Sequence, residues 1–359
     1  MIDIFNEFYQ GKRVLVTGHT GFKGSWLSIW LHELGAKVTG ISLDPYSERD
    51  NFVLSGIGDK ITADIRADIR DGKRMKEIFT EYQPEIVFHL AAQPLVRLSY
   101  DIPVETYEVN VMGTIHVMEA IRATPSVKVG VMITTDKCYD NNEQKEGYVE
   151  TDPFGGYDPY SSSKGACEVA IQSWRRSFFN PQDYGSTHTV SLASVRAGNV
   201  IGGGDWALDR IIPDCIRALE DARAIEIRSP KAVRPWEHVL EPLFGYMLLA
   251  KKMWDNPTEY CEGWNFGPEA ENASTVWEMA TALTKSYGSG ELKDASDPKA
   301  LHEANLLMLN IIKAKSRLGW KPRMNMEQCM ELVTDWYKRY RTEDVYNICI
   351  EEIEKFLTY

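Results

Sequence analysis

A glycine-rich turn between a strand pattern and a helix-length segment constrains the fold of this chain more than any other feature. The turn spans Thr17–Gly24 and reads TGHTGFKG. It follows the apolar run Arg13–Thr17 and leads into a predicted helix from Ser25 to Leu34. Glycines at this spacing allow a tight turn and let the backbone approach a pyrophosphate, which the helix N-terminus also attracts. The turn therefore predicts a dinucleotide-binding site in a β-α-β unit.

An acidic residue after the next predicted strand indicates which dinucleotide this unit binds. Asp44 follows the strand pattern Lys37–Leu43. Its carboxylate can accept a hydrogen bond from a ribose 2′-OH and would repel a 2′-phosphate, which favours NAD over NADP. Alternatively, the glycines form a plain turn and Asp44 is only a turn residue. The side chains of His19 and Lys23 either contact the phosphates or point to solvent. The candidate cofactor-binding residues are Thr17, Gly18, His19, Gly21, Phe22, Lys23, Gly24 and Asp44.

Strand patterns alternate with helix-length segments through the first half of the chain. Such alternation predicts an α/β fold with a Rossmann-type doubly wound parallel sheet. Further strands are expected at 86–90, 127–134 and 189–196, and helices at 104–123 and 159–178. The glycine-rich residues 198–206 predict a loop, followed by helices at 275–287, 313–318 and 326–340. We expect a nucleotide-binding domain over 1–197, to which later segments cross back, and a smaller substrate-binding region mainly over 198–359.

Composition excludes several classes of protein. The chain has 359 residues and a formal net charge of −12, which disfavours nucleic-acid binding because phosphates need a basic surface. No apolar run approaches the ~18 residues that cross a bilayer, and the acidic N-terminal residues do not resemble a secretory signal. The six cysteines form no C-x-x-C pair and the seven histidines do not cluster, so we expect reduced thiols and no metal site. A soluble cytoplasmic protein is expected.

Tyr160 and Lys164 are the first candidates for catalysis. They lie four residues apart in a predicted helix and so share one face. A nearby ammonium lowers the pKa of a phenol by stabilising the phenolate, which can take a proton from an alcohol while hydride leaves the carbon. A Y-x-x-x-K pair is common by chance, but here it accompanies the glycine turn and a strand that ends at Thr134. The combination predicts a hydride-transfer site.

The order of these motifs resembles the extended short-chain dehydrogenase/reductase family. The matching pieces are TGHTGFKG at 17–24, DI at 68–69, HLAAQ at 89–93, NVMGT at 110–114, YSSSK at 160–164, NVIG at 199–202, RPW at 234–236 and NFGP at 265–268. The resemblance covers most of the chain and implies a Rossmann domain, bound NAD and a nucleotide-sugar substrate. It also implies cofactor contacts by Asp68, Ile69, Leu90, Ala91, Ala92 and Thr134.

The segment Thr134–Tyr139 separates activities within this family. The family's 4,6-dehydratases carry Ser or Thr, Asp and Glu here, whereas its epimerases usually carry small, non-acidic residues. This chain has Thr135 and Asp136 but places Lys137 where Glu is usual. The segment, the TGHTGFKG turn and RPWEH at 234–238 resemble the dehydratases that act on CDP-D-glucose. Alternatively, Asp136 and Lys137 only cap a strand end as an ion pair.

A 4,6-dehydration uses these groups one after another. Oxidation at sugar C4 creates a ketone that acidifies the C5 hydrogen. A base removes that hydrogen, an acid protonates the departing 6-hydroxyl, and the stored hydride returns at C6. We expect Tyr160, Lys164 and Thr135 to serve the hydride steps and Asp136 to be the general acid. Lys137 is either a neutral-amine base or an ammonium that stabilises the enolate.

Polar residues in the second half fit a substrate diphosphate. The Arg234 guanidinium offers a planar fork to phosphate oxygens, and Asn199 and Arg210 could donate to them as well. Each arginine is otherwise a surface charge. By the resemblance, Gln93 also contacts the substrate.

Three other functions stay open. They are a 4,6-dehydratase for another nucleotide-sugar, a nucleotide-sugar epimerase, and a non-catalytic NAD-sensing scaffold that keeps the fold. The resemblance otherwise implies an enzyme at the entry to deoxysugar synthesis for surface polysaccharide, such as the O-antigen of lipopolysaccharide. A homo-oligomer, dimer or tetramer, is expected, with an exposed helix pair packed across a two-fold axis.

Overall fold

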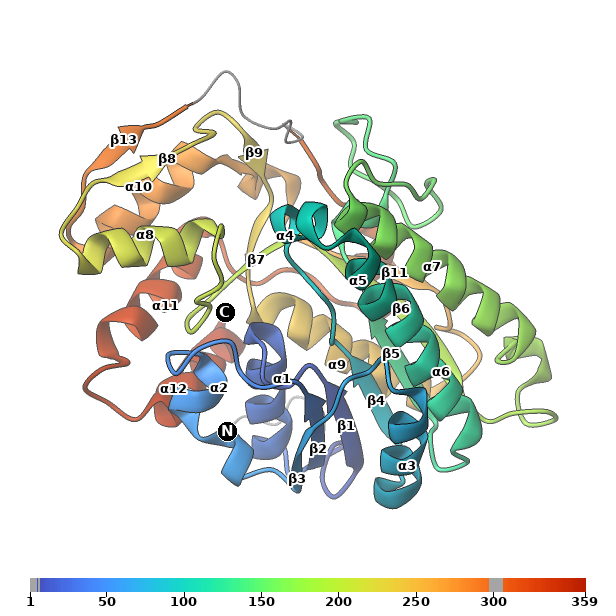
Figure 1. Ribbon diagram of the computed structural model, residues 1–359. Coiled ribbons are helices and arrows are strands. Elements are labelled where there is room, and N and C mark those ends of the chain that lie inside the picture. The colour runs from blue at the N-terminus through green and yellow to red at the C-terminus, as the bar shows by residue number, and fades with distance from the viewer. Residues whose placement is uncertain (1–4, 6, 297–305) are drawn as a thin grey trace.

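The computed structural model describes residue 5, residues 7–296 and residues 306–359, and is built on a central parallel sheet (Figure 1). Within these residues the sheet has seven strands in the order β11-β6-β5-β4-β1-β2-β3. The order reverses between β1 and β4, the point where open α/β sheets bind ligands. The predicted Rossmann-type doubly wound fold is confirmed. The strands are β1 (Arg13–Thr17), β2 (Lys37–Ser42), β3 (Ala63–Arg66), β4 (Ile86–His89), β5 (Val129–Ile133), β6 (Ser191–Ala197) and β11 (Gly263–Phe266).

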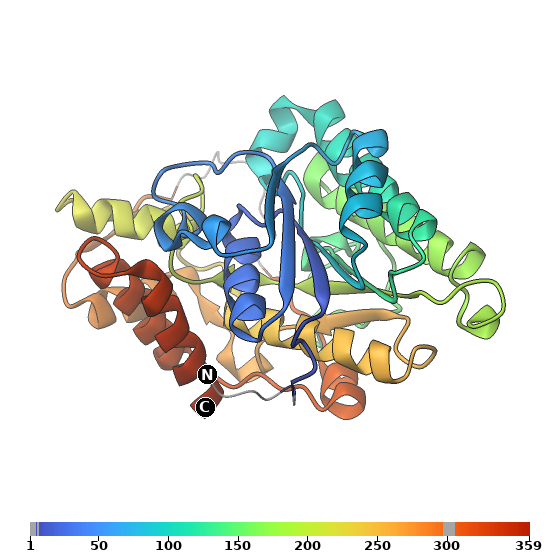
Figure 2. The same cartoon turned by 90° about the horizontal axis from the view of Figure 1, so that it is seen from below.

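Alternating strand residues pack into two cores, one on each face of the sheet. On β1, Val14 and Val16 belong to one core and Leu15 to the other, because successive side chains of a strand point to opposite faces. Figure 2 shows α9 on one side of the sheet and α3, α6 and α7 on the other. The helices that cover the sheet are α1 (Phe22–Glu33) and α9 (Leu240–Asp255) on one face, and α3 (Gly72–Tyr82), α6 (Gly113–Ala123) and α7 (Pro159–Ser177) on the other.

Residues 198–359 both complete this sheet and build a second region beside it (Figure 1). They supply β11, the edge strand, and α9. The division at residue 197 remains a proposal, since one hydrophobic core continues from α1 and α9 into α8, α10 and α11. The second region contains β7 (Asn199–Ile201), α8 (Ile211–Glu220), β8 (Ile225–Ile227), β9 (Val233–Arg234), β10 (Trp236–His238), β12 (Ser274–Thr275), α10 (Val276–Tyr287), β13 (Leu292–Asp294), η6 (Ala314–Leu318), α11 (Met326–Arg339) and α12 (Val345–Thr358).

Two segments differ from the sequence expectations. The predicted loop over 198–206 is wrong for residues 199–201, which form β7 and pair in parallel with β10. The predicted helix over 104–123 is divided into α5 (Pro103–Tyr107), a π-helical segment η2 (Glu108–Met112) and α6. A π-bulge changes the direction of side chains along a helix, and here it contains Asn110, which is fully buried.

The remaining short elements are α2 (Asn51–Ser55), α4 (Val96–Asp101) and 3-10 turns such as η3 (Asp136–Cys138). Among the described residues, no helix is both long and apolar enough to cross a membrane.

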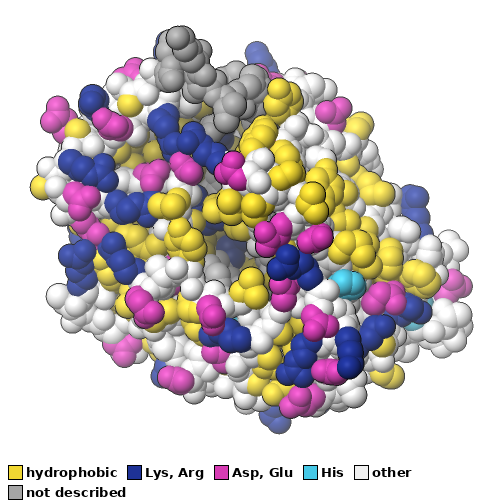
Figure 3. All heavy atoms as spheres, viewed as in Figure 1, with side chains coloured by type: hydrophobic (Ala, Val, Ile, Leu, Met, Phe, Trp, Pro, Cys, Tyr) yellow, Lys and Arg dark blue, Asp and Glu magenta, His cyan; other side chains and the backbone are white. Residues whose placement is uncertain are grey.

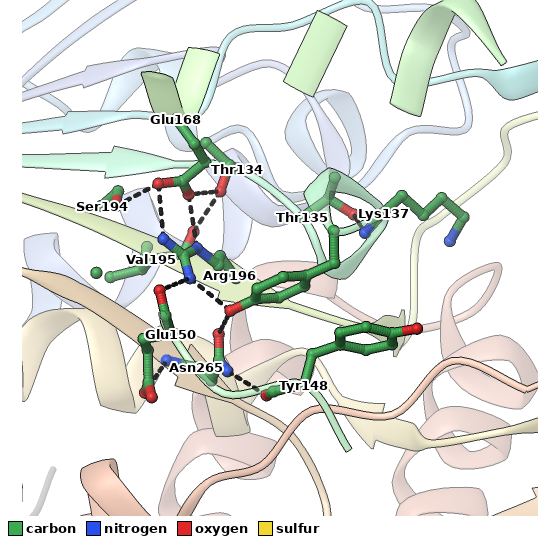
Figure 4. A network of polar contacts seen from close by, with 12 residues as sticks. Thr134, Thr135, Lys137, Tyr148, Glu150, Glu168, Ser194, Val195, Arg196 and Asn265 are labelled. Atoms are coloured by element: carbon green, nitrogen blue, oxygen red, sulfur yellow. Dashed lines mark hydrogen bonds and ion pairs between the residues drawn. The ribbon is translucent and has the colours of Figure 1, made fainter. Parts of the chain in front are cut away.

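A buried ion pair joins α7 to the sheet (Figure 4). Glu168 and Arg196 are each 2% exposed, with 2.9 Å between Arg196 Nε and Glu168 Oε1. Glu168 also accepts hydrogen bonds from the hydroxyls of Thr134 and Ser194, and Arg196 donates to the Tyr139 hydroxyl. Buried charges are tolerated only when they are paired and hydrogen-bonded. The network therefore holds α7 against the ends of β5 and β6.

We predict that Glu168→Gln lowers the free energy of unfolding by about 3–5 kcal/mol, because it leaves the Arg196 guanidinium buried without a counter-charge. Urea unfolding followed by tryptophan fluorescence measures this change. The control is Lys285→Ala, which removes an exposed pair with Glu327 and should cost about 1 kcal/mol or less. Equal losses in the two variants would contradict the role given to the buried pair.

Candidate active site

The glycine turn has the geometry that a close-lying pyrophosphate requires. Gly18 has a φ of 75°, and a Cβ on it would lie 2.7 Å from the Ala91 nitrogen. A Cβ on Gly24 would lie 2.0 Å from the Gly18 carbonyl oxygen, so only glycine lets α1 pack against the turn. Gly21 caps α1 without a side-chain hydrogen bond. The first N–H groups of α1 are therefore left for an anion.

A charged cluster lies beside the turn, at the ends of β2 and β3. The Asp44 side chain is 89% exposed, and Arg66 Nε donates to its Oδ1 at 3.1 Å. His19 is fully buried rather than pointing to solvent, with its Nε2 2.6 Å from Asp64 Oδ1. Burial lowers the pKa of His19. The carboxylate predicted for the ribose is thus accessible, but it shares its oxygens with an arginine that the sequence analysis did not single out.

The ends of β1 and β4 form the floor beside the turn. Thr17 Oγ1 lies 2.7 Å from His89 Nδ1 and accepts a hydrogen bond from the Ala91 nitrogen at 3.2 Å. Leu90 donates its backbone N–H to the Thr17 carbonyl, and Leu90, Ala91 and Ala92 are all partly buried. These residues therefore form one continuous surface with the glycine turn.

The residues after β3 are held by their own neighbours. Asp68 accepts hydrogen bonds from the Arg70 backbone and guanidinium, at 2.8 and 2.7 Å. Ile69 is 4% exposed and packs in the core that α3, α6 and α7 cover. Contacts from Asp68 and Ile69 to an adenine stay a prediction.

The dehydratase-like segment forms a tight turn directly after β5. Thr135 caps η3 and donates its hydroxyl to Asp136 Oδ1 at 2.8 Å. Asp136 is fully buried, and its Oδ2 has no hydrogen-bond partner within the described protein. Lys137 Nζ lies 3.6 Å from Asp136 Oδ1, and one third of the Lys137 side chain is exposed. Figure 4 shows Lys137 extending away from the buried network beneath it. An unsatisfied carboxyl oxygen therefore lies beside a lysine that solvent can reach.

Tyr160 and Lys164 occupy the first turns of α7 beside this segment. Asp158 caps the helix and Pro159 begins it, so Tyr160 lies in its first turn. The Tyr160 backbone N–H donates to Ser99 Oγ at 3.1 Å. Burial raises the pKa of the Tyr160 phenol, and its hydrogen bond with Thr135 acts in the opposite direction. Burial also lowers the pKa of Lys164. The phenol, the Thr135 hydroxyl and Asp136 thus meet at one point.

Two further cations act on the same point. Burial, followed by the charge of Lys164, lowers the pKa of Lys23 to about 8. Arg210 precedes α8, is one third exposed, and pairs with Asp205 at 2.8 Å. Its charge also affects the pKa of Tyr160. Arg210 therefore belongs to the electrostatic surroundings of the Tyr160 phenol, and Lys164 belongs to those of Lys23.

The candidate substrate-binding residues differ in the hydrogen bonds that their side chains already make within the protein. The Asn199 Nδ2 is buried without a hydrogen-bond partner in the described protein. The Gln93 amide is instead occupied, since its Nε2 donates to the Thr106 hydroxyl and its Oε1 accepts from the Leu95 backbone. Arg234 Nη1 donates to the Val233 carbonyl. Their contacts with a substrate stay predictions, and Gln93 would have to exchange its present bonds.

Several residues that organise the site were not found from the sequence. Arg196 and Glu168 support the ends of β5 and α7, and Glu237 on β10 is buried close enough to affect Lys23. Strand and helix periodicity would place each of them among ordinary core or surface positions. One signal could have identified such a residue, namely a charged side chain inside an otherwise mostly apolar stretch. Arg196 in SLASVRA is an example. All six cysteines are free and buried, and no metal-binding cluster occurs within the ranges described.

The comparisons with known proteins agree with this geometry. Residues 15–333 match the family described as GDP-mannose 4,6 dehydratase. The chain belongs to this family. It is 47% identical to the CDP-glucose 4,6-dehydratase of Salmonella typhimurium over 359 residues, which cover 100% of this chain and 99% of that protein. It is 27% identical to the human dTDP-D-glucose 4,6-dehydratase over 332 residues, 91% of this chain and 90% of that protein.

Solved structures of other proteins share the fold. A dTDP-glucose 4,6-dehydratase from Bacillus anthracis, solved in complex with NAD, has a TM-score of 0.75 at 20% identity, covering 92% of this chain and 97% of that one. The epimerase Mth375 of Methanothermobacter thermautotrophicus has a TM-score of 0.78 at 24% identity, covering 94% and 96%. Both structures thus have the architecture of this chain.

We predict that the protein binds NAD more tightly than NADP and that Asp44→Ala reduces or reverses this preference. The substitution removes the carboxylate that repels a 2′-phosphate and frees Arg66 to pair with it. Titration of both cofactors, followed by quenching of tryptophan fluorescence, measures the two dissociation constants. Glu48→Ala is a matched control on the same loop. Tighter binding of NADP by the unaltered protein would contradict the prediction.

Proposed function

We propose that this protein is an NAD-dependent lyase that converts CDP-D-glucose to CDP-4-keto-6-deoxy-D-glucose and water. The observation that carries the proposal is the buried turn in which Asp136, Thr135 and the Tyr160 phenol meet. An alcohol oxidation needs the phenol, and a loss of water needs the acid, so this turn combines the two half-reactions. The 47% identity to a CDP-glucose 4,6-dehydratase over the whole chain supports the same assignment.

The residues around the glycine turn fit a bound NAD. The open N-terminus of α1 and the glycines at 18, 21 and 24 would hold the pyrophosphate, and Asp44 would hold the adenosine ribose. Ala91, Ala92 and Thr134 would lie along the rest of the molecule, with Lys164 near the nicotinamide ribose. When bound, NAD supplies the acceptor for the C4 hydride and the donor for its return at C6.

Tyr160 would take the proton of the C4 hydroxyl during oxidation. In the protein alone its phenol stays protonated, because burial raises its pKa. Positive charge at the centre has to offset that burial. Arg210 acts on Tyr160 in this direction, and Lys164 on the same helix face would add to it. The Thr135 hydroxyl lies between Tyr160 and Asp136 and orients the alcohol by hydrogen bonding.

Asp136 and Lys137 would carry out the elimination as a coupled pair. At their 3.6 Å separation, one proton could pass from the ammonium to the carboxylate through a bridging water. That single transfer creates both groups the reaction needs, a neutral amine to remove the C5 proton and a carboxylic acid to protonate the departing 6-hydroxyl. The Lys137 ammonium alone, stabilising an enolate, is the alternative role.

The choice of nucleotide rests on sequence similarity. The full-length relative named above acts on CDP-glucose by its name, and the Lys137 substitution is part of the same resemblance. Asn199, Arg210 and Arg234 are the groups we assign to the substrate diphosphate.

The protein would work in the cytoplasm as a homo-oligomer. Figure 3 shows hydrophobic side chains gathered on the face formed by α4, α5 and α7. A group of this kind is unusual on a monomer and fits an isologous helix-pair interface. The exposed residues are Leu98, Tyr100, Val104, Tyr107, Met112, Val169 and Phe178.

The substrate assignment predicts a clear preference for CDP-glucose among CDP-, dTDP-, UDP- and GDP-glucose at equal concentration. Turnover is followed by the alkaline absorbance of the 4-keto-6-deoxy product. Preference for another nucleotide would reject the CDP assignment and keep the dehydratase.

Substrate deuterated at C4 has to yield product with deuterium at C6. Retention of deuterium at C4 with inversion there would show an epimerase instead.

We predict that Asp136→Asn permits oxidation at C4 but blocks loss of water, so that reduced nicotinamide accumulates on the enzyme. Stopped-flow absorbance at the reduced-nicotinamide band measures this accumulation. Tyr160→Phe is the control, since it should slow the first oxidation by about 10²–10⁴-fold and leave the cofactor oxidised. Rapid water loss by Asp136→Asn would exclude Asp136 as the acid.

The two roles of Lys137 separate in the same assay. Lys137→Arg keeps a positive charge but cannot serve as a neutral-amine base. Loss of exchange of the C5 hydrogen with solvent deuterium in this variant would identify a base, and near-normal exchange would identify an electrostatic stabiliser.

A further inference from the structure

A second buried carboxyl group lies at the active site and has no role in the reaction described so far. Glu237 is on β10 and is 1% exposed. Neither of its carboxyl oxygens makes a hydrogen bond of normal geometry within the described protein, although the Gly198 backbone N–H is close enough to favour the carboxylate. An unsatisfied buried carboxyl is costly. A buried carboxyl of this kind therefore points to a nearby cation that stabilises its ionised form.

The packing of β10 brings Glu237 to the catalytic centre. β10 pairs with β7, where Glu237 lies opposite Val200 and next to the pair Trp236–Asn199. The Phe22 ring of α1 lies against Gly202 and Val239, which follow β7 and β10, so the first turn of α1 packs on this strand pair. A Cβ on Gly198, the residue before β7, would lie 3.4 Å from Asp136 Oδ2. The β7–β10 pair that carries Glu237, together with Gly198 before it, therefore contacts both the first turn of α1 and the proposed catalytic acid.

Lys23 is the cation that faces Glu237. It belongs to the first turn of α1, and Lys23 and Glu237 each affect the pKa of the other. No ion pair of 4 Å or less joins them in the part of the chain described. The charges of Lys164 and Asp136, which flank the proposed hydride-transfer point, also act on Lys23. The Lys23 amine and the Glu237 carboxyl thus lie near the centre without an ion pair between them.

Other groups around Glu237 oppose its ionisation. Burial and then the Glu241 carboxyl of α9 raise the pKa of Glu237, and Asp136 adds to this effect. The charge of Glu237 in turn raises the pKa values of Tyr246 on α9 and Cys329 on α11. Because only Lys23 favours the carboxylate among the charged groups named, added positive charge at the centre would promote its ionisation.

We propose that Glu237 is a positioning residue whose buried carboxyl, opposite Lys23, sets how strongly the site prefers oxidised over reduced nicotinamide. The oxidised ring carries a positive charge and the reduced ring carries none. An ionised Glu237 stabilises the oxidised ring, whereas an uncompensated Lys23 ammonium disfavours it. The inference rests on the proposed NAD-dependent function, because both hydride steps require the two forms to be balanced.

The ratio of the dissociation constants for NAD⁺ and NADH tests the proposal without turnover. The ratio is measured by fluorescence titration at one pH. We expect Glu237→Gln to raise it by about 5–20-fold, the order expected for one charge at this range in a partly shielded site. Lys23→Met should lower it, and the double variant should return it close to the unaltered value. Glu352→Gln, which removes another buried carboxyl on α12, should leave it unchanged.

Proton release gives a second readout. Calorimetric titration with NAD⁺ in buffers of different ionisation enthalpy should show a proton released by the unaltered protein and none by Glu237→Gln. A ratio unchanged within two-fold in both Glu237→Gln and Lys23→Met would overturn the proposal and leave Glu237 a structural residue. If Glu237→Gln does not fold, Lys23→Met decides alone. Failure to bind either nicotinamide form would instead overturn the proposed function.

Discussion

The buried Glu168–Arg196 ion pair is the interaction on which the geometry of the active site depends. Glu168 lies one helical turn beyond Lys164 on α7, and Arg196 lies on β6 beside β5, which ends at Ile133. Sliding or rotation of α7 would leave two desolvated charges unpaired, at a cost of several kcal/mol. The Glu168–Arg196 ion pair therefore sets how far Tyr160 and Lys164 on α7 lie from the acidic turn after β5. It does so without contacting the two α7 residues or that turn.

A second constraint is the concentration of charge at a buried point. Lys23, Lys164, Asp136 and Glu237 come from α1, α7, η3 and β10, and they act on one another through an interior where charges are weakly screened. Glycines make this possible, because Gly18 and Gly24 in the turn after β1 let backbones approach closely. The same crowding explains why the pKa of Lys23 responds to the charges of Lys164, Glu237 and Asp136.

Local patterns predicted the elements that carry the chemistry. The strand–turn–helix unit, Asp44, and the placement of Tyr160 and Lys164 on one helix followed from spacing, because glycine tolerance and helical periodicity act over a few residues. Spacing could not show that η2 turns Asn110 inward, that Arg66 shares Asp44, or that 199–201 forms a strand. Each of these depends on a partner far away in the chain.

The sequence by itself determined the fold class and placed the glycine turn and the acidic segment on which the proposed NAD site and the proposed dehydration rest. Only the tertiary structure decided which charges meet. Lys23 and Glu237 are separated by more than half of the chain, and Glu237 occupies a position that strand alternation would assign to either face. Burial makes them interact, because removal of water strengthens every charge that remains. Desolvation is a property of packing, and no pattern of neighbouring residues encodes it.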